Sequence, residues 1–150
     1  MSAYPIEPFS VPAYILFFII LWMGVCKLIS ATGGWRILAR DYRANSLFDG
    51  QKLWLKSATL RRWTNYSNCV NMGANKYGLY LSVLLLFRIG HPPLFIPWTD
   101  ISTEAVSRRL LLDVVKFSFA KQPEVPMILS KKLADRIFKM QQDSQHGVGV

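Results

Sequence analysis

An uncharged run of 18 residues near the N-terminus, Phe9–Cys26, constrains this chain more than any other feature. Extended to Ala31, the apolar segment Val11–Ala31 has 21 residues. As an α-helix it is about 31 Å long, which matches the hydrocarbon core of a bilayer. Pro12 falls in the first turn of this helix, where its missing N–H costs nothing. The run therefore predicts a transmembrane helix over this segment.

Two alternatives to this spanning helix fit less well, and so does the addition of a second span. A helix that is apolar on every side is buried in a large protein or spans a membrane, and a chain of 150 residues is too small for the first. A cleavable signal peptide needs a basic N-terminal region, but Met1–Ser10 contains Glu7 and no Lys or Arg. A second span over Tyr77–Thr99 is disfavoured, because Arg88 would lie near its middle and be followed by helix-breaking prolines.

The charges on the two sides of the span predict its orientation. The first ten residues carry one acid, whereas the other side begins with a group of basic residues, Lys27, Arg36, Arg40 and Arg43. The positive-inside rule places this basic side in the cytoplasm and residues 1–10 outside, as a short extracytoplasmic N-terminus. We therefore expect an integral protein of the plasma membrane, of the bacterial inner-membrane type, with a cytoplasmic C-terminal domain. Two cysteines are too few for a disulfide scaffold and suit a reducing compartment.

After the span, the sequence predicts a short helix, a linker and a β-rich domain. Residues 34–51 are interpreted as a juxtamembrane helix followed by a polar linker, and residues 52–142 as the domain. Alternating apolar and polar side chains in the domain favour antiparallel strands. The expected strands are Leu53–Trp63, Tyr66–Asn71, Tyr77–Phe87, Leu94–Trp98, Ile101–Ser107, Leu110–Ala120 and Met127–Leu129.

The remaining segments connect or close these strands. Met72–Lys76 is predicted to be a turn, because Gly and Asn tolerate a positive φ. A hairpin is expected around Arg108 and Arg109. Ser130 is a suitable N-cap for a helix over Lys131–Gln142, whose apolar residues recur at helical spacing. Residues 143–150 are expected to form a flexible tail.

The order of three motifs adds a resemblance to known domains. GLYLSVLLLF is followed by PPLFIPWTDIS and then by PMILSKKLADRIF, within Gly78–Phe138. This order resembles the small pleckstrin-homology-like (PH-like) and GRAM-like domains, and the chain is similar to bacterial membrane proteins built as one span plus a PH-like domain. The resemblance implies a small antiparallel β-barrel or sheet with a C-terminal capping α-helix. It implies little about function, because one fold hosts many functions.

Residues with catalytic chemistry are sparse. One nucleophile–base set exists, Cys69 with His91 and Asp100, and its spacing does not force the side chains together. Two histidines and two distant cysteines cannot supply the usual three or four metal ligands. No glycine-rich phosphate loop follows a strand. We therefore expect no cofactor, no metal and no enzyme activity, and keep a small membrane enzyme using Cys69 and His91 as a weaker alternative.

The positive charge is the remaining clue to function. The chain has 18 Lys+Arg against 9 Asp+Glu, a formal net charge of +9. Basic residues held beside an anionic leaflet contribute about 1 kcal/mol each, and tryptophans favour the interface. The candidate anionic-lipid contacts are Lys27, Arg36, Arg40 and Arg43, and the candidate interface anchors are Trp35 and Trp54. The same charges could instead act only as a topology signal, and that alternative stays open.

Together these patterns predict a membrane-anchored, non-enzymatic binding or adaptor module. Its expected partner is anionic phospholipid or a membrane or cytoplasmic protein at the cytoplasmic membrane face. Nucleic acid is not expected, because the strands lack the interleaved basic and aromatic residues of single-strand binders. A structural subunit of a membrane complex is the alternative, although the span lacks a small-xxx-small packing motif.

Overall fold

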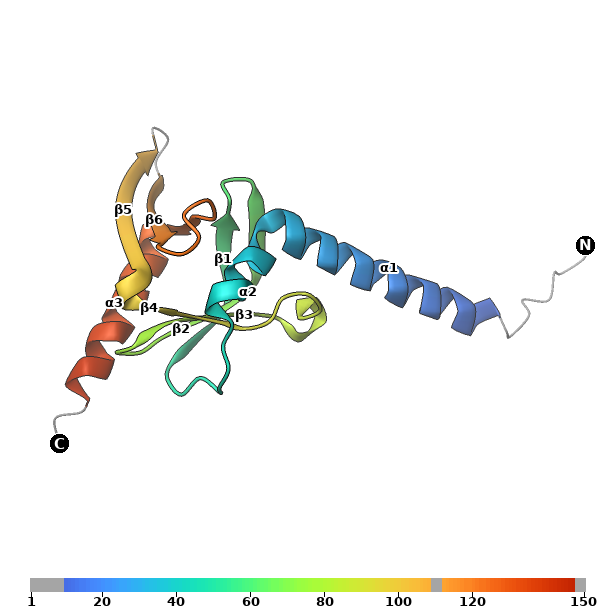
Figure 1. Ribbon diagram of the computed structural model, residues 1–150, viewed down its shortest axis with the longest axis horizontal. Coiled ribbons are helices and arrows are strands. Elements are labelled where there is room, and N and C mark those ends of the chain that lie inside the picture. Colours follow the sequence, from blue (N-terminus) through green and yellow to red (C-terminus); the bar gives the residue numbers. More distant parts are fainter. Residues whose placement is uncertain (1–9, 109–111, 148–150) are drawn as a thin grey trace, which may run out of the picture.

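The computed structural model describes residues 10–108 and 112–147, and consists of a long helix that projects from a β-rich body (Figure 1). The helices are α1 (Ser10–Gly33), α2 (Trp35–Tyr42) and α3 (Lys131–His146), with two 3-10 turns, η1 (Leu85–Phe87) and η2 (Trp98–Asp100). The strands are β1 (Lys52–Leu60), β2 (Thr64–Ala74), β3 (Gly78–Val83), β4 (Leu94–Pro97), β5 (Ile101–Arg108), β6 (Leu112–Phe119) and β7 (Met127–Ser130).

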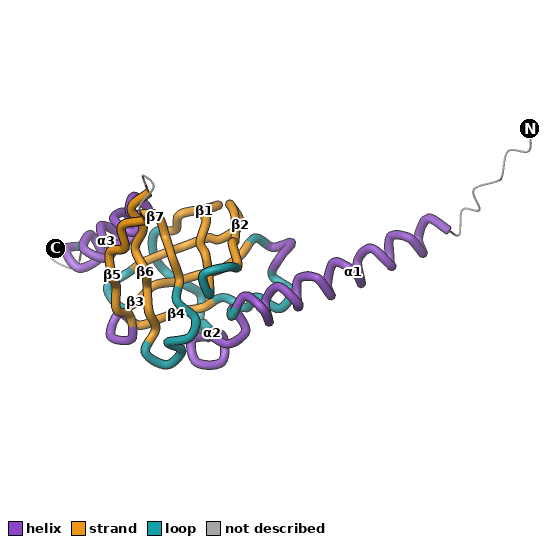
Figure 2. The backbone as a smooth tube through the Cα atoms, turned by 90° about the horizontal axis from the view of Figure 1, so that it is seen from above, coloured by secondary structure: helices purple, strands orange, loops and turns teal. Residues whose placement is uncertain are grey.

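The strands of the described chain form one antiparallel sheet in the order β4-β3-β2-β1-β7-β6-β5. The two edge strands, β4 and β5, follow one another in the chain with only η2 between them. The sheet therefore curls until its edges approach at one corner (Figure 2). β1 pairs with β7 only at Thr59 and Leu60. The result is a half-barrel around one apolar core.

Two helices bury their apolar sides in this core. α3 begins after Ser130, whose Oγ accepts a hydrogen bond from Leu133 N at 3.3 Å, as the predicted N-cap requires. Phe138 of α3 stacks on Phe117 of β6, with 5.8 Å between ring centroids. The side chains of α2 that enter the core are Trp35, Leu38 and Tyr42. α2 is therefore part of the folded domain rather than of a linker.

α1 is 24 residues long and apolar enough to span a bilayer, and it is the one such helix in the described part of the chain. Most of its side chains point away from the domain; those of Phe17 and Ile20, for example, are 66% and 60% exposed. Only Cys26, Ser30 and Gly33, near its C-terminal end, are buried. An apolar surface on all sides is what a helix in an apolar medium requires.

Two predicted boundaries in the middle of the sheet are wrong. β2 continues through Ala74, and the turn follows at Asn75, whose Oδ1 accepts hydrogen bonds from the N–H groups of Tyr77 and Gly78. The strand predicted to end at Phe87 instead ends at Val83. The leucines that follow continue an apolar pattern but leave the sheet as η1, which lies against α1.

The C-terminal helix is longer than predicted, since α3 runs to His146 rather than to Gln142. It therefore includes the first residues of the predicted tail, and residues 148–150 lie outside the described residues. The predicted hairpin around Arg108 and Arg109 and the start of the predicted strand at Leu110 fall partly on residues 109–111, which also lie outside them. The same holds for most of the predicted N-terminal segment, because the description begins at Ser10.

Candidate membrane-facing site

The chain turns sharply between α1 and α2 at Gly34. Its φ of +86° lies in the left-handed region, which glycine adopts without steric cost. A Cβ at this position would lie 2.6 Å from Cγ1 of Val125, in the β6–β7 loop. A Cβ on the neighbouring Gly33 would lie 2.8 Å from the hydroxyl of Tyr66. The two glycines thus let α1 end in direct contact with the domain.

A buried cluster of Trp35, Tyr66 and His91 lies at this turn. Trp35 Nε1 donates a hydrogen bond to Pro92 O at 2.8 Å, and the ring of Trp35 lies 5.5 Å from that of His91. His91 Nε2 is 3.2 Å from the Tyr66 hydroxyl, and Nδ1 is 3.3 Å from Ile89 O. A neutral imidazole that donates from Nδ1 and accepts at Nε2 satisfies both contacts.

Burial sets the protonation of this cluster. Desolvation lowers the pKa of His91, against the opposing effect of hydrogen bonds to backbone carbonyls, and desolvation raises the pKa of Tyr66. Both shifts favour the neutral side chain. The cluster therefore acts as an uncharged support for the joint between α1 and the sheet.

A cavity of about 490 Å³ opens at the same joint. Its walls come from the end of α1, from α2 and from the β3–β4 loop (residues 84–93). The residues that line it are Lys27, Ser30, Arg36, Ala39, Arg40, Arg43, Gly90 and Pro92. The four predicted lipid-contact residues thus share one cavity, all with exposed side chains, and no acidic residue of the described chain lines it. Lys and Arg side chains that line one cavity favour phosphate or carboxylate ligands.

The two predicted interface anchors have different positions. The prediction for Trp35 is wrong, because its side chain is 1% exposed and fills the core beneath α2. Trp54 is 61% exposed. It lies on β1 six residues before Leu60, about 20 Å along the strand from the turn that contacts α1. The structure does not bring Trp54 to the basic cavity, and its role stays a prediction.

The turn between β1 and β2 lies beside the end of α1, and its residues were not among the predicted contacts. Arg61 Nη1 donates to Thr32 O at 3.3 Å, so the turn lies against the base of α1. Trp63, two residues on, is 75% exposed. Arg61 and Arg62 both have a left-handed φ, +53° and +71°, which costs about 1–2 kcal/mol per residue. The Arg-Arg-Trp sequence was the available signal, but it was assigned to the end of a strand.

The candidate nucleophile–base set is not assembled. Among the described residues no hydrogen bond joins any two of Cys69, His91 and Asp100, because His91 contacts Tyr66 and Asp100 lies beside the Tyr42 hydroxyl. Burial raises the pKa of the Cys69 thiol, which favours the unreactive protonated form. This geometry gives the alternative of a cysteine-dependent enzyme no support.

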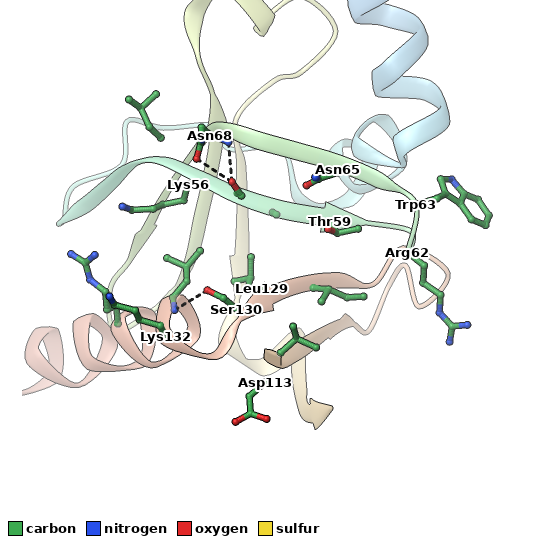
Figure 3. Close-up of a pocket in the computed structure, with 17 residues that line it drawn as sticks. Lys56, Thr59, Arg62, Trp63, Asn65, Asn68, Asp113, Leu129, Ser130 and Lys132 are labelled. Atoms are coloured by element: carbon green, nitrogen blue, oxygen red, sulfur yellow. Dashed lines mark hydrogen bonds between the residues drawn. The ribbon is translucent and has the colours of Figure 1, made fainter. Parts of the chain in front are cut away.

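A larger cavity of about 690 Å³ lies where β1 diverges from β7, next to the start of α3 (Figure 3). Its wall carries basic residues, among them Lys56, Arg62 and Lys132, and also Asp113. Every polar side chain that lines it is at least partly exposed. This mixture of charges, without a buried polar group to orient a ligand, indicates no particular chemistry.

Neither a metal site nor a known relative indicates what this cavity binds. The described residues contain no group of three or more His, Cys, Asp or Glu side chains that could hold a metal ion. No protein-family model, no curated protein and no solved structure matches this chain.

Proposed function

We propose that this protein is a single-span, non-enzymatic membrane protein whose PH-like domain binds an anionic lipid headgroup at the cytoplasmic face. The observation that carries the proposal is the basic cavity. Lys27 from α1, Arg36 and Arg40 from α2 and Arg43 at the C-cap of α2 line it, and no acidic side chain of the described residues does. An anion in this cavity would be attracted by all four cations.

The position of the cavity supports a lipid rather than a soluble anion. Lys27 directly follows the uncharged run Phe9–Cys26, so the cavity begins where the apolar surface of α1 ends. With α1 across a bilayer, this level corresponds to the phosphate groups of one leaflet. A volume of about 490 Å³ is within the usual range for small-ligand sites.

The rigid joint supports a binding role as well. Arg36, Arg40 and Arg43 belong to or cap a helix whose other side is buried in the core, so their backbone positions are fixed relative to α1. A flexible basic tail could serve as a topology signal equally well. A docked basic helix next to a membrane anchor is better suited to holding one headgroup, because less motion is lost on binding.

The half-barrel closed by α3 is compatible with a PH-like domain, which the order of motifs suggested. A PH-like fold by itself does not identify a ligand. The proposal that this domain binds a lipid headgroup therefore depends on the cavity. The basic flank predicts a cytoplasmic location for the domain through the positive-inside rule.

The proposal is tested by measuring lipids bound to the full-length protein by native mass spectrometry from a neutral detergent. We expect phosphatidylglycerol to bind more tightly than phosphatidylcholine, with a preference that weakens at high salt. The double variant R36Q/R40Q should bind phosphatidylglycerol about thirtyfold more weakly at low salt.

The matched control is K131Q/K139Q, which removes the same charge from exposed positions on α3. It should keep the wild-type preference. Equal binding of both lipids by the wild type, or equal loss in the two double variants, would reject a headgroup site at the α1–α2 joint.

A further inference from the structure

The β3–β4 loop presents a second apolar surface beside α1. The chain leaves the sheet after Val83, forms η1 (Leu85–Phe87) and returns at Leu94. The side chains of Leu85 and Leu86 are 76% and 70% exposed. In water these two side chains would expose apolar surface at the tip of the loop. Exposed apolar surface of this kind marks contacts with protein or membrane.

This loop lies along α1. Trp22 Nε1 donates a hydrogen bond to Leu86 O at 3.0 Å, and the Trp22 ring lies 5.4 Å from that of Phe87. Closer to the domain, Ser30 Oγ donates to Gly90 O. The hydrogen bonds from Trp22 and Ser30 show that the loop follows α1 over about two turns (Figure 1). Its exposed leucines continue the exposed apolar surface of that helix.

The contact with Trp22 fixes how far the tip reaches along α1. Trp22 lies five residues before Lys27, which is about 7.5 Å of helix. Apolar faces that bind at a membrane surface are buried by roughly 5–10 Å. With Lys27 at the level of the headgroups, Leu85 and Leu86 reach that depth.

The carbonyls of the tip are suited to apolar surroundings, where an unsatisfied carbonyl costs several kcal/mol. Three successive carbonyls accept hydrogen bonds: Leu84 O from Phe87 N at 2.9 Å, Leu85 O from Arg88 N at 3.2 Å, and Leu86 O from the Trp22 indole. Arg88, which is exposed, directly follows the tip. Its long side chain can extend back to the phosphates.

We propose that Leu85 and Leu86 insert into the same leaflet that α1 enters, so that lipid acyl chains cover them. The inference rests on the proposed function in one respect, the passage of α1 through the bilayer. A second membrane contact beside α1 restricts how far α1 and the docked domain can tilt in the bilayer. In this orientation the basic cavity, which shares Gly90 with the loop, is held against the headgroups.

The test places the fluorophore bimane on single introduced cysteines in the full-length protein, in nanodiscs of phosphatidylcholine and phosphatidylglycerol. The variants are L86C, L85C, I20C on the exposed face of α1, and L47C, whose parent side chain is 99% exposed in the 44–51 connector. Wild-type protein treated identically corrects for Cys26 and Cys69. Quenching by acyl-chain nitroxide lipids is compared with quenching by iodide in water.

We expect labels at 86 and 85 to behave like the label at 20, with strong quenching by the lipid nitroxide and weak quenching by iodide, and the label at 47 to show the reverse. If the label at 20 is lipid-quenched but those at 86 and 85 are quenched by iodide, the inserted loop is rejected and the span is kept. If the label at 20 is also iodide-quenched, the span and the inference built on it both fail. Protection of 85 and 86 from both quenchers would mean that protein covers the loop, and would also reject insertion.

Discussion

His91 is the residue on which the joint between α1 and the sheet depends most directly. It is 2% exposed, and its two ring nitrogens contact Tyr66 and Ile89. A proton on Nε2 would remove the acceptor that the Tyr66 hydroxyl uses and place a charge beside the ring of Trp35. The neutral form is therefore part of the native packing.

This dependence predicts a loss of stability in mild acid. The folded pKa of His91 lies below the unfolded value of about 6.5, because burial disfavours the charged ring. Below that pH the unfolded imidazole binds a proton that the folded one does not, so the contribution of His91 is complete above about pH 6.5 and falls as the pH drops. Thermal unfolding of wild type and H91Q at about pH 7.5 and pH 5.5 measures the effect.

We expect the fall in Tm between these two pH values to be smaller for H91Q than for wild type. The control is H146Q, since His146 is exposed and is the other histidine of the chain. H146Q should keep the wild-type pH dependence. An unchanged fall in H91Q would show that His91 does not couple the joint to pH.

At the scale of elements, the direction in which α2 leaves α1 depends on Gly34. Replacement by alanine forces a left-handed φ on a residue with a Cβ and drives that Cβ against Val125. Strain and overpacking together cost at least about 2 kcal/mol, which lowers Tm by about 8 °C or more for a domain of this size.

The matched control for G34A is G24A, because a Cβ on Gly24 meets nothing within 4 Å. Differential scanning calorimetry in one detergent compares the two variants. G24A should stay within about 1 kcal/mol of wild type. Equal Tm values for G34A and wild type would contradict the role assigned to the glycine turn.

Elements with a local signal were predictable from the sequence, and those set by tertiary contacts were not. α3 was predicted because Ser130 caps it and its apolar residues repeat at helical spacing. The basic cavity was partly predictable, since three of its four cations lie close together in the chain.

Trp35 was misplaced because an amphipathic juxtamembrane helix has the same pattern whether its apolar side meets lipid or a protein core. η1 was missed for a similar reason, because alternating leucines fit a strand and do not reveal that part of the run lies against α1.

At the scale of the whole molecule, α1 is long and apolar enough to span a bilayer and is also a structural part of the domain. Its last turns supply buried Cys26 and Ser30, and its end receives the hydrogen bond from Arg61 to Thr32 O. Removal of the span at the predicted domain edge would cut through these contacts. The functional unit therefore begins inside α1, before the joint.

A pair of truncations tests this view. Residues 25–150 keep the docked end of α1, whereas residues 33–150 lose Cys26, Ser30 and Thr32. Two hydrogen bonds, from Ser30 to Gly90 O and from Arg61 to Thr32 O, and the burial of a small apolar side chain contribute about 2–3 kcal/mol together, so the shorter fragment should unfold at a Tm lower by roughly 8 °C or more. Both fragments keep Leu85 and Leu86, so any aggregation through the loop affects them equally. Full-length S30A, which removes only the hydrogen bond to Gly90 O, should lose about 1 kcal/mol. Equal Tm values for the two fragments would mean that α1 only tethers the domain and that the joint does not stabilise it.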